Sequence, residues 1–462
     1  MREKTKSLIL QIINTLNVIL ITAPIAWCWF HYYARRLVVP YYNRGNWIVV
    51  LIFVILYVIF SRIYDGFSMT TNRISETVYS QGLAIVISDF LMFLIITLLS
   101  RVYFPKVSPL LRAFVLQLVI SVFFTWACHK WYYASFPPNA AAVVYDSRPG
   151  LEELIREYRM EKEFRVEQVL HIDECLEDLD LLREMDTVFL SGVHSHERNV
   201  VLKYCVDKGI DAYVIPRIGD VIVSGADRAH MFHLPVLRVG RYNPSLYYQF
   251  VKRLADILIS GLGIVILSPL FLLTALAIKL YDGGPVLYKQ KRLTKDGKVF
   301  NVLKFRSMKV DAEKDGVARL STGENDDRIT PVGCVIRKVR LDELPQLFCI
   351  LVGHMAICGP RPERPEIAAQ YEKEMPEFRL RLQTKAGLTG YAQVYGKYNT
   401  TPYDKLLMDL MYIAHPSVLE DLRIIFATIK ILFQPESTEG VAAGQVTAAR
   451  ETDKKDENER DE

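Results

Sequence analysis

The sequence has few cysteines, and none of them lies in a metal-binding pattern. Only seven of its 462 residues are cysteine, with no CxxC pair and no Cys/His cluster at zinc spacing. Most lie among apolar neighbours, which predicts reduced, buried thiols on the cytosolic side of a membrane. This pattern argues against a zinc site and against a disulfide-stabilised secreted domain.

A signal-peptide cleavage site is also absent. The N-terminal segment is apolar but has no small-residue cleavage site, so we expect a retained membrane anchor. Hydrophobic residues make up 51% of the chain, and its mean hydropathy is +0.14. Both values are high for a soluble protein and indicate that part of the chain lies in lipid.

Four apolar runs dominate residues 1–136. They lie near 8–29, 46–61, 83–104 and 109–129, and each approaches the ~20 residues that cross a bilayer as a helix. Basic residues lie both before the first run and in the loop after it, which would be on opposite faces of the membrane. Their distribution therefore leaves the orientation of the helices open. The sequence therefore predicts four transmembrane helices.

Residues 137–243 alternate between strand-like and helical patterns, which predicts a Rossmann-like parallel α/β domain. The expected strands are 140–145, 166–171, 187–190 and 212–215, and the expected helices are 150–159 and 196–208. The first turn, 146–150, lacks a GxGxxG loop, so a pyrophosphate would approach its backbone poorly. We interpret the domain as degenerate, with a structural or regulatory role; a cofactor site is the alternative.

Residues 244–282 begin with an amphipathic, aromatic and basic segment that is typical of an interfacial helix. The apolar run 256–280 follows and is interrupted by Ser268 and Pro269. Proline removes a backbone donor and kinks a helix. Two readings stay open: a fifth span, or a re-entrant hairpin that enters and leaves by the same membrane face.

The remaining chain divides by charge. Residues 283–435 hold 24 Lys/Arg and 18 Asp/Glu, and read as a basic mixed domain of helices and loops with few clean strands. Residues 436–462 hold 4 Lys/Arg and 9 Asp/Glu and are expected to be disordered. From these patterns the predicted fold class is membrane α plus α/β, with a four-helix transmembrane region, a Rossmann-like parallel α/β domain, and a mixed α/β domain that follows the apolar run 256–280.

Two adjacent carboxylates, Asp342 and Glu343, carry the strongest chemical signal. Neighbouring side chains on a helix or loop point in different directions, so one can act as a nucleophile and the other as a metal ligand. Cations surround the pair in sequence: Lys304, Arg306, Arg337, Lys338, Arg340 and Arg361. This framing suits a site that holds phosphates and a divalent metal together; a surface network of ion pairs is the alternative.

Arg361 stands between Pro360 and Pro362. Because each proline fixes φ, the arginine is presented from a stiff support and can bind phosphate oxygens at low ordering cost. A rigid surface turn without a ligand is the alternative.

With these motifs in order, residues 250–432 closely resemble the bacterial sugar transferase family, the polyprenyl-phosphate phosphoglycosyl transferases of monotopic type. The long members carry four membrane spans and a degenerate Rossmann-like domain before the catalytic part. The resemblance to the monotopic type implies a re-entrant membrane helix hairpin within 244–282, joined to a mixed α/β catalytic domain at 283–435. The matching pieces are Lys252-Arg253 with Asp256, Ser268-Pro269, Gly284-Pro285-Val286, Gln290 with Arg292, Lys304 to Met308, Asp326 with Arg328 to Thr330, Gly333, Leu341 to Leu347, Gly359 to Pro362, Gly387 to Gly390, Ala392 to Val394, Tyr412 and Asp421.

The resemblance implies an enzyme that moves a sugar-1-phosphate, a hexose-1-phosphate above all, from a UDP-sugar to polyprenyl (undecaprenyl) phosphate and releases UMP. It implies that Asp342 is the nucleophile and forms a phosphosugar-aspartate, and that Glu343 and Asp342 hold Mg²⁺. Phosphate contacts would come from Arg361, Lys304, Arg306 and Arg328. This would be the first membrane step of exopolysaccharide, capsule or O-antigen synthesis, on the cytoplasmic face of the bacterial inner membrane.

The chain departs from the family pattern at His354, where an acidic residue is usual. The dyad itself is intact. A homodimer is expected and a nucleic-acid partner is not. The competing function is a non-catalytic scaffold or sensor of a polysaccharide assembly complex, which would release no UMP. The sequence leaves the sugar open between a hexose and an N-acetylhexosamine.

Overall fold

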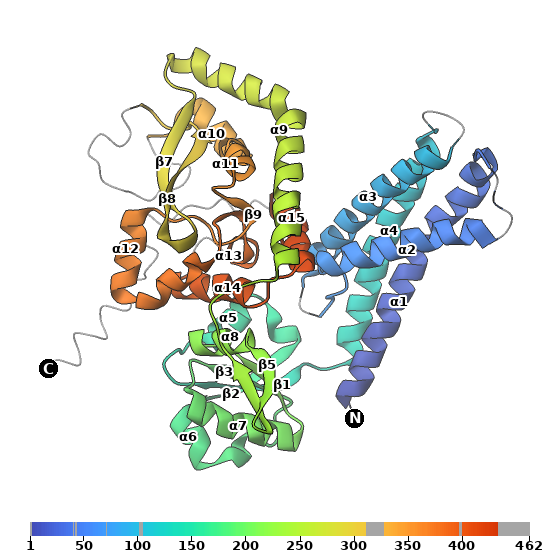
Figure 1. Ribbon diagram of the computed structural model, residues 1–462. Coiled ribbons are helices and arrows are strands. Elements are labelled where there is room, and N and C mark those ends of the chain that lie inside the picture. The colour runs from blue at the N-terminus through green and yellow to red at the C-terminus, as the bar shows by residue number, and fades with distance from the viewer. Residues whose placement is uncertain are drawn as a thin grey trace. The chain divides into compact units, whose positions relative to one another are not determined.

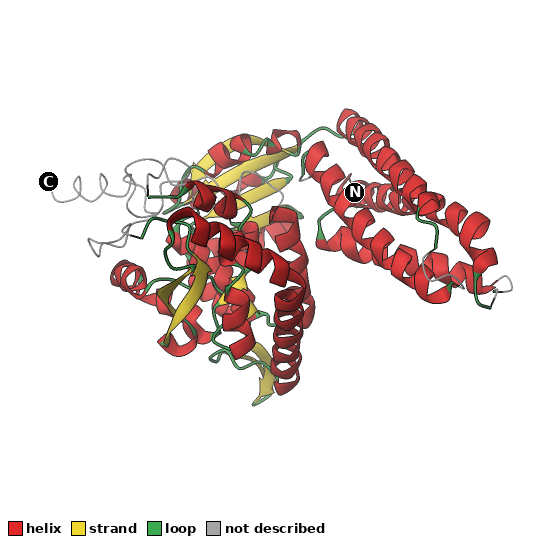
Figure 2. Cartoon of the chain, turned by 90° about the horizontal axis from the view of Figure 1, so that it is seen from above, coloured by secondary structure: helices red, strands yellow, loops and turns green. Residues whose placement is uncertain are grey.

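The structure is a computed structural model that describes residues 2–39, 41, 44–70, 72–100, 105–310, 328–396 and 400–432. Asp326 and the tail 436–462 lie outside the described residues. Two compact units divide the chain, Met1–Ile215 and Pro216–Glu462. The domain boundaries drawn from the sequence stay predictions. Helices account for most of the described chain, and the strands gather in short sheets (Figure 2).

The first unit opens with long apolar helices that match the four predicted runs: α1 (Arg2–Cys28), α2 (Arg44–Ile63), α3 (Ile74–Leu99) and α4 (Ser108–Ser135). They pack together as a bundle (Figure 1). Its interior contains hydrogen-bonded polar side chains: Gln81 accepts from the Ser121 hydroxyl at 2.7 Å and donates to the Gly66 carbonyl at 2.9 Å. Such bonds link helices where lipid supplies no hydrogen-bond partner.

The α/β part of the first unit confirms the predicted parallel sheet. Strands β1 (Asn139–Tyr145), β2 (Phe164–His171), β3 (Thr187–Ser191) and β4 (Asp211–Val214) are all parallel, in the order β2-β1-β3-β4. Helices α5 (Leu151–Glu157), α6 (Ile172–Glu177) and α7 (Ser195–Lys208) connect them. The central strands are apolar runs buried on both faces, as a covered parallel sheet requires.

The second unit begins with α8 (Ile218–Ser224) and the antiparallel hairpin β5 (Asp227–Met231) and β6 (Leu234–Arg238). Helix α8 packs on α14 (Pro402–Ala414) through Val221, which belongs to the same buried cluster as Leu410 and Ile413. The contact is close: a Cβ at Gly225 would lie 2.8 Å from Ala414.

Helix α9 (Leu246–Asp282) is one continuous element that includes both the predicted interfacial segment and the apolar run. Ser245 caps its start by accepting from the Tyr248 amide at 3.3 Å. The helix bends partway along its length (Figure 1), and Pro269 is the one proline within it. Five helices of the described chain, α9 included, are long and apolar enough to cross a membrane.

The rest of the second unit is mixed α/β, as predicted. The strands are β7 (Leu287–Leu293) paired antiparallel with β8 (Val299–Phe305), and β9 (Ala356–Cys358) paired parallel with β10 (Gly387–Thr389). The helices and turns around them are α10 (Pro331–Lys338), η6 (Leu341–Glu343), α11 (Gln346–Val352), α12 (Pro365–Glu374), η7 (Pro376–Gln383), α13 (Tyr391–Tyr395) and α15 (Val418–Leu432). The core contains Val302, Ile350, Leu406 and Ile424, so strands and helices distant in sequence share one interior.

Gly333 lies where α10 packs closely against the segment after β8. We predict that alanine at this position destabilises the second unit. A Cβ at Gly333 would lie 1.9 Å from the Ser307 carbonyl oxygen, so the two segments would have to separate. In the full-length protein in detergent, Gly333→Ala should lower the thermal unfolding midpoint by about 4 °C or more. Gly219→Ala is the control: nothing lies within 4 Å of its Cβ position, so the midpoint should stay or rise. Equal midpoints for the two variants would contradict the packing.

Candidate active site

The two acidic residues singled out from the sequence lie on the single turn η6, between α10 and α11. Arg340 precedes the turn with a left-handed φ of 54°, which redirects the chain after α10. In a 3₁₀ turn, consecutive side chains diverge by about 120°. Asp342 and Glu343 therefore face different surroundings although they are adjacent in sequence.

Glu343 is the acceptor on which the site converges. Lys304 Nζ lies 3.0 Å from its Oε1, and Arg361 Nη2 lies 3.0 Å from the same oxygen. Lys304 comes from β8, and Arg361 follows β9. The structure thus brings together three of the predicted site residues from three segments of the chain, through charge-assisted hydrogen bonds.

These residues line a pocket that is open to solvent on one side, with about 260 Å³ of space between its walls when the open solvent is included. Its walls are Arg292, Val302, Lys304, Glu343, Gln346, Arg361, Pro362, Gly387 and Leu388. Arg292 and Gln346 match the family pattern in the sequence, but the sequence analysis assigns them no role. The alternation of strand β7 predicts that Gln290 and Arg292 face one side, but only the fold shows which side meets the dyad.

The pKa values of the two carboxylates are shifted in opposite directions. Burial alone would raise the pKa of Glu343, but the Lys304 ammonium and the Arg361 guanidinium together hold that pKa well below its usual range. Burial, and then the negative charge of Glu343, raise the pKa of Asp342, while Lys304, Arg337 and Arg361 oppose the rise. Glu343 is therefore a fixed anion, and Asp342 carries the carboxylate whose charge is less stabilised.

The arginines respond to the same charges. Glu343, as the nearest anion, raises the pKa of Arg361, so that guanidinium stays charged. Burial lowers the pKa of Arg292 to about 10, with Glu363 opposing the change, which leaves it cationic at neutral pH. The pocket therefore offers fixed positive charge to an anionic ligand.

Arg306 has other partners, and for Arg328 the structure gives a backbone contact. Arg306 is buried; it pairs with Asp282 at the end of α9 and donates from Nε to the Pro285 carbonyl at 2.7 Å. Arg328 follows the undescribed segment, and its carbonyl accepts from the Lys309 amide at 2.9 Å. The Arg306 contacts join β8 to α9, and a phosphate role for either arginine stays a prediction.

Ser268 and Pro269, the predicted membrane break, lie within α9. The Ser268 hydroxyl donates to the Val265 carbonyl at 2.8 Å, so it satisfies an acceptor near the position where proline removes a donor.

His354, the departure from the family pattern, belongs to the turn after α11. Its carbonyl accepts from the Thr294 hydroxyl at 3.1 Å, and its ring centroid lies 6.2 Å from that of Phe300. These contacts give it a role in packing the turn.

The donor set of the dyad fits a magnesium ion that shares its coordination with a substrate. Within the described residues no group of three or more His, Cys, Asp or Glu side chains could hold a metal. Mg²⁺ is commonly bound through one or two carboxylates, several waters and substrate phosphates. Both cation contacts of Glu343 described above use Oε1, so Oε2 and Asp342 are the oxygens that suit such an ion.

Comparison with known proteins places the catalytic part in one family. The bacterial sugar transferase family model matches residues 247–435. A UDP-N-acetylgalactosamine-undecaprenyl-phosphate N-acetylgalactosaminephosphotransferase of Aeromonas hydrophila is 38% identical over 234 residues, which is 50% of this chain and 54% of the relative. The UDP-glucose:undecaprenyl-phosphate glucose-1-phosphate transferase of Escherichia coli K12 is 41% identical over 186 residues, 39% of this chain and 40% of the relative.

The matched region spans about half or less of these longer relatives. A shorter relative is matched over nearly its whole length. The exopolysaccharide production protein PSS of Rhizobium leguminosarum bv. phaseoli is 40% identical over 188 residues, 39% of this chain and 93% of the relative. That coverage, together with the ordered motifs around Asp342 and Arg361, decides the assignment: the chain belongs to the bacterial sugar transferase family.

Proposed function

We propose that this protein transfers a sugar-1-phosphate from a UDP-sugar to polyprenyl phosphate and releases UMP. The observation that carries the proposal is the pairing of Asp342 with Glu343, whose negative charge is fixed by Lys304 and Arg361 at 3.0 Å each. Two of the relatives are named for this transfer to undecaprenyl phosphate, with glucose or N-acetylgalactosamine as the sugar.

In the first proposed step, an Asp342 carboxylate oxygen attacks the sugar-bearing phosphorus of the UDP-sugar. A new P–O bond forms to the aspartate, the bond to the bridging oxygen breaks, and UMP leaves with that oxygen. The diphosphate repels an anionic nucleophile, so cations must lower this repulsion first. Lys304, Arg361 and Arg292 surround the pocket and supply positive charge. The raised pKa of Asp342 fits a carboxylate held in a state that favours reaction.

In the second step, a phosphate oxygen of the polyprenyl phosphate attacks the same phosphorus. The acyl phosphate bond breaks, Asp342 is regenerated as a carboxylate, and the lipid diphosphate sugar forms. An acyl phosphate preserves the free energy of the broken anhydride, so this transfer needs no further energy source. One carboxylate thus serves both substrates in turn.

Glu343 and Asp342 would hold a Mg²⁺ ion during this exchange. A bound Mg²⁺ supplies charge neutralisation to the diphosphate. Glu343 suits this role because its depressed pKa keeps it ionised across the physiological range.

The sugar is proposed to be a hexose such as glucose or galactose. Both glucose and N-acetylgalactosamine are named among the relatives, at similar identities of 41% and 38%. A panel of UDP-sugars in the assay below separates the two classes.

We propose that α9 enters and leaves the membrane by one face, the cytoplasmic face of the inner membrane. Three contacts support this: near its start, Tyr248 donates to Asp421 at 2.9 Å; near its end, Ile278 packs with Phe305 and Ile336; and Arg241 before the helix pairs with Asp296 after it. All belong to one compact unit, whereas a straight helix of 37 residues would separate its ends by about 55 Å. Strand β7, which returns from the helix, is too polar to lie in hydrocarbon.

Asp342→Asn tests the proposed transfer. Purified protein with polyprenyl phosphate, a UDP-sugar and Mg²⁺ should release UMP, and the variant should lose about 10³-fold or more of this rate. Its thermal unfolding midpoint should stay or rise, because burial disfavours the charged Asp342 and the neutral amide removes that cost.

Asp296→Asn, the same chemical change at a surface ion pair, is the control and should retain UMP release. Without polyprenyl phosphate, label from the sugar-bearing phosphate should remain bound to the wild-type protein and be absent from Asp342→Asn. Full activity in Asp342→Asn, or an inactive wild-type protein across the UDP-sugar panel, would rule the transfer out and favour a scaffold.

The pH dependence follows from the raised pKa of Asp342. The nucleophile must be ionised, so kcat/KM should rise with pH through that pKa, at a midpoint above the ordinary value of 3.8. The measurement is UMP release from pH 4 to 8 at subsaturating UDP-sugar, with return to pH 7 after each exposure to exclude unfolding. Mg²⁺ bound to Asp342 would itself lower this pKa, so the profile is repeated at decreasing Mg²⁺ concentrations. A rate that is already maximal at pH 4 at every Mg²⁺ concentration would mean that burial and Glu343 do not act on the nucleophile.

The membrane topology can be tested by labelling the two flanks of α9. The variants Asn243→Cys and Lys298→Cys place a cysteine at an exposed position on each flank, in a Cys334→Ser background. Both cysteines should react with an impermeant maleimide from the same side of the membrane only, the cytoplasmic one. Reaction from opposite sides would show that α9 is a fifth span.

A further inference from the structure

The segment that presents Arg361 is held at four consecutive backbone carbonyls. The Pro360 carbonyl accepts from the Gly387 amide at 2.9 Å, and the Glu363 carbonyl accepts from the Leu293 amide at 2.9 Å. Between them, two arginine side chains take the place of backbone donors: Arg381 Nη2 donates to the Arg361 carbonyl at 3.1 Å, and Arg292 Nη1 donates to the Pro362 carbonyl at 2.9 Å.

Arg381 is the more deeply buried of these two donors, with 4% of its side chain exposed. It comes from η7, and its Nη2 also lies 2.6 Å from Asp409 Oδ2 on α14, a side chain that is 1% exposed. Its guanidinium stacks over the Phe378 ring, 4.8 Å from the centroid. The stacked Phe378 ring and the buried counter-ion therefore fix the guanidinium plane.

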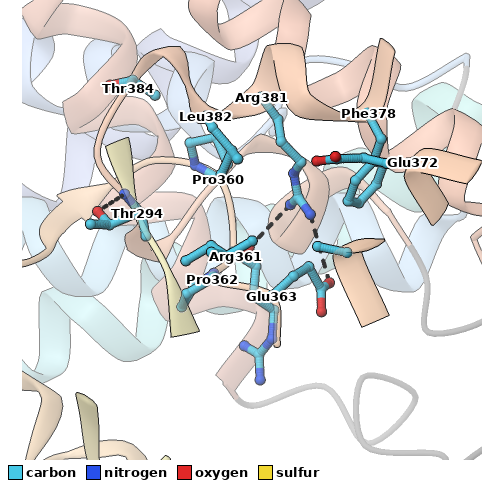
Figure 3. A pocket seen from close by; sticks show the side chains of 13 residues that line it. Thr294, Pro360, Arg361, Pro362, Glu363, Glu372, Phe378, Arg381, Leu382 and Thr384 are labelled. Atoms are coloured by element: carbon cyan, nitrogen blue, oxygen red, sulfur yellow. Dashed lines mark hydrogen bonds and ion pairs between the residues drawn. The ribbon is translucent and has the colours of Figure 1, made fainter. Parts of the chain in front are cut away.

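Glu363 connects the two arginines. Its Oε1 lies 3.7 Å from Arg381 Nη1, and its Oε2 lies 3.8 Å from Arg292 Nη1. Figure 3 shows Arg381 between the Arg361 backbone and Glu363, with the Arg361 guanidinium pointing away from Arg381. Arg361 therefore has different partners on its two sides. Its backbone carbonyl contacts the buried Arg381, and its guanidinium contacts Glu343 and lines the pocket.

We propose that Arg381 is a positioning residue for the transfer, which sets the orientation of Arg361 by binding its backbone carbonyl while Asp409 holds Arg381 in place. The proposal rests on the proposed function. This role explains why the Arg381–Asp409 ion pair is buried next to the turn. Pro360 and Pro362 have no N–H, so the turn has no backbone donors of its own at these two positions. A carbonyl held from below restricts the ψ of Arg361 and with it the direction of the guanidinium.

The geometry separates this role from general stabilisation. A buried pair that acted only on stability would need no contact with the turn, yet one Nη2 atom meets both Asp409 and the Arg361 carbonyl. Lysine at 381 can keep the charge next to Asp409, but it lacks the planar fork that reaches both partners.

A double-mutant cycle on the full-length protein tests the proposal through UMP release. Arg381→Lys should lower kcat/KM by about tenfold, because a misplacement of about 1 Å in a binding group is costly to the rate. In an Arg361→Lys background, which keeps a cation at this position, the same change should cost less than about twofold, since no guanidinium fork remains to be oriented.

Arg253→Lys is the matched control. Arg253 also donates to two backbone carbonyls, those of Ile350 and Leu351 at 2.8 Å each, but not in the Arg361 turn. Its effect should be the same in both backgrounds. If Arg381→Lys does not fold, Asp409→Asn replaces it in the cycle, because it keeps the side-chain shape and weakens the hold on Arg381.

The outcomes are distinct. Non-additivity of Arg381 with Arg361, and additivity of Arg253 with Arg361, support the positioning role. Additive effects of Arg381 and Arg361, to within about twofold, overturn it and leave a purely structural ion pair. Failure of the proposed function itself would appear as wild-type protein without UMP release, before any variant is compared.

Discussion

The site depends on one carboxylate oxygen, Glu343 Oε1, which accepts from Lys304 and Arg361. This contact joins β8, the dyad turn and the segment after β9, none of which is adjacent in sequence. Without the shared anion, the Lys304 ammonium and the Arg361 guanidinium, which both contact Oε1, would repel each other. The contact therefore makes a cationic pocket compatible with a compact fold, and it leaves the neighbouring Asp342 with less stabilisation than its partner.

Helix α9 is fastened to the same elements that carry the site. Asp256 accepts from the Ile357 amide on β9 at 2.9 Å, three residues before the proline-flanked turn begins. Arg253 binds the carbonyls at the end of α11, which starts just after the dyad, and Lys252 contacts Asp421 on α15 at 2.9 Å. Helix α9 is therefore in direct contact with the segments that carry the dyad and Arg361. Under the proposed topology, the depth of α9 in lipid would set the distance of the pocket from the membrane surface.

Much of the architecture could be predicted from the sequence because it depends on local periodicity and length. The apolar runs gave the helices of the bundle, and the short apolar runs between helical segments gave the parallel sheet. The dyad and Arg361 could be found because they lie in short motifs. Their meeting with Lys304 was expected from family resemblance, but the distances required the fold.

For other residues, the sequence pattern does not show which partner each side chain contacts. Arg381 lies in the polar segment η7 and Asp409 in the amphipathic helix α14, where a charged residue usually faces solvent, yet both side chains are almost fully buried. Arg306 appeared in a basic motif, which made it a candidate phosphate contact, while the fold directs it to Asp282 and the Pro285 carbonyl. In each case the deciding partner is distant in the chain, and a single sequence carries no information on such pairings.

The contact between Lys252 and Asp421 has a consequence for biosynthesis. The partners are separated by 169 positions, and both side chains are largely buried. When α9 emerges from the ribosome, its lysine has no folded-state counter-ion, and none exists until nearly the whole described chain has been made. The end of α9 that carries Lys252 can therefore take its final place against α15 only after residue 421 has been made, whereas the apolar run 256–280 favours lipid from the moment it is synthesised.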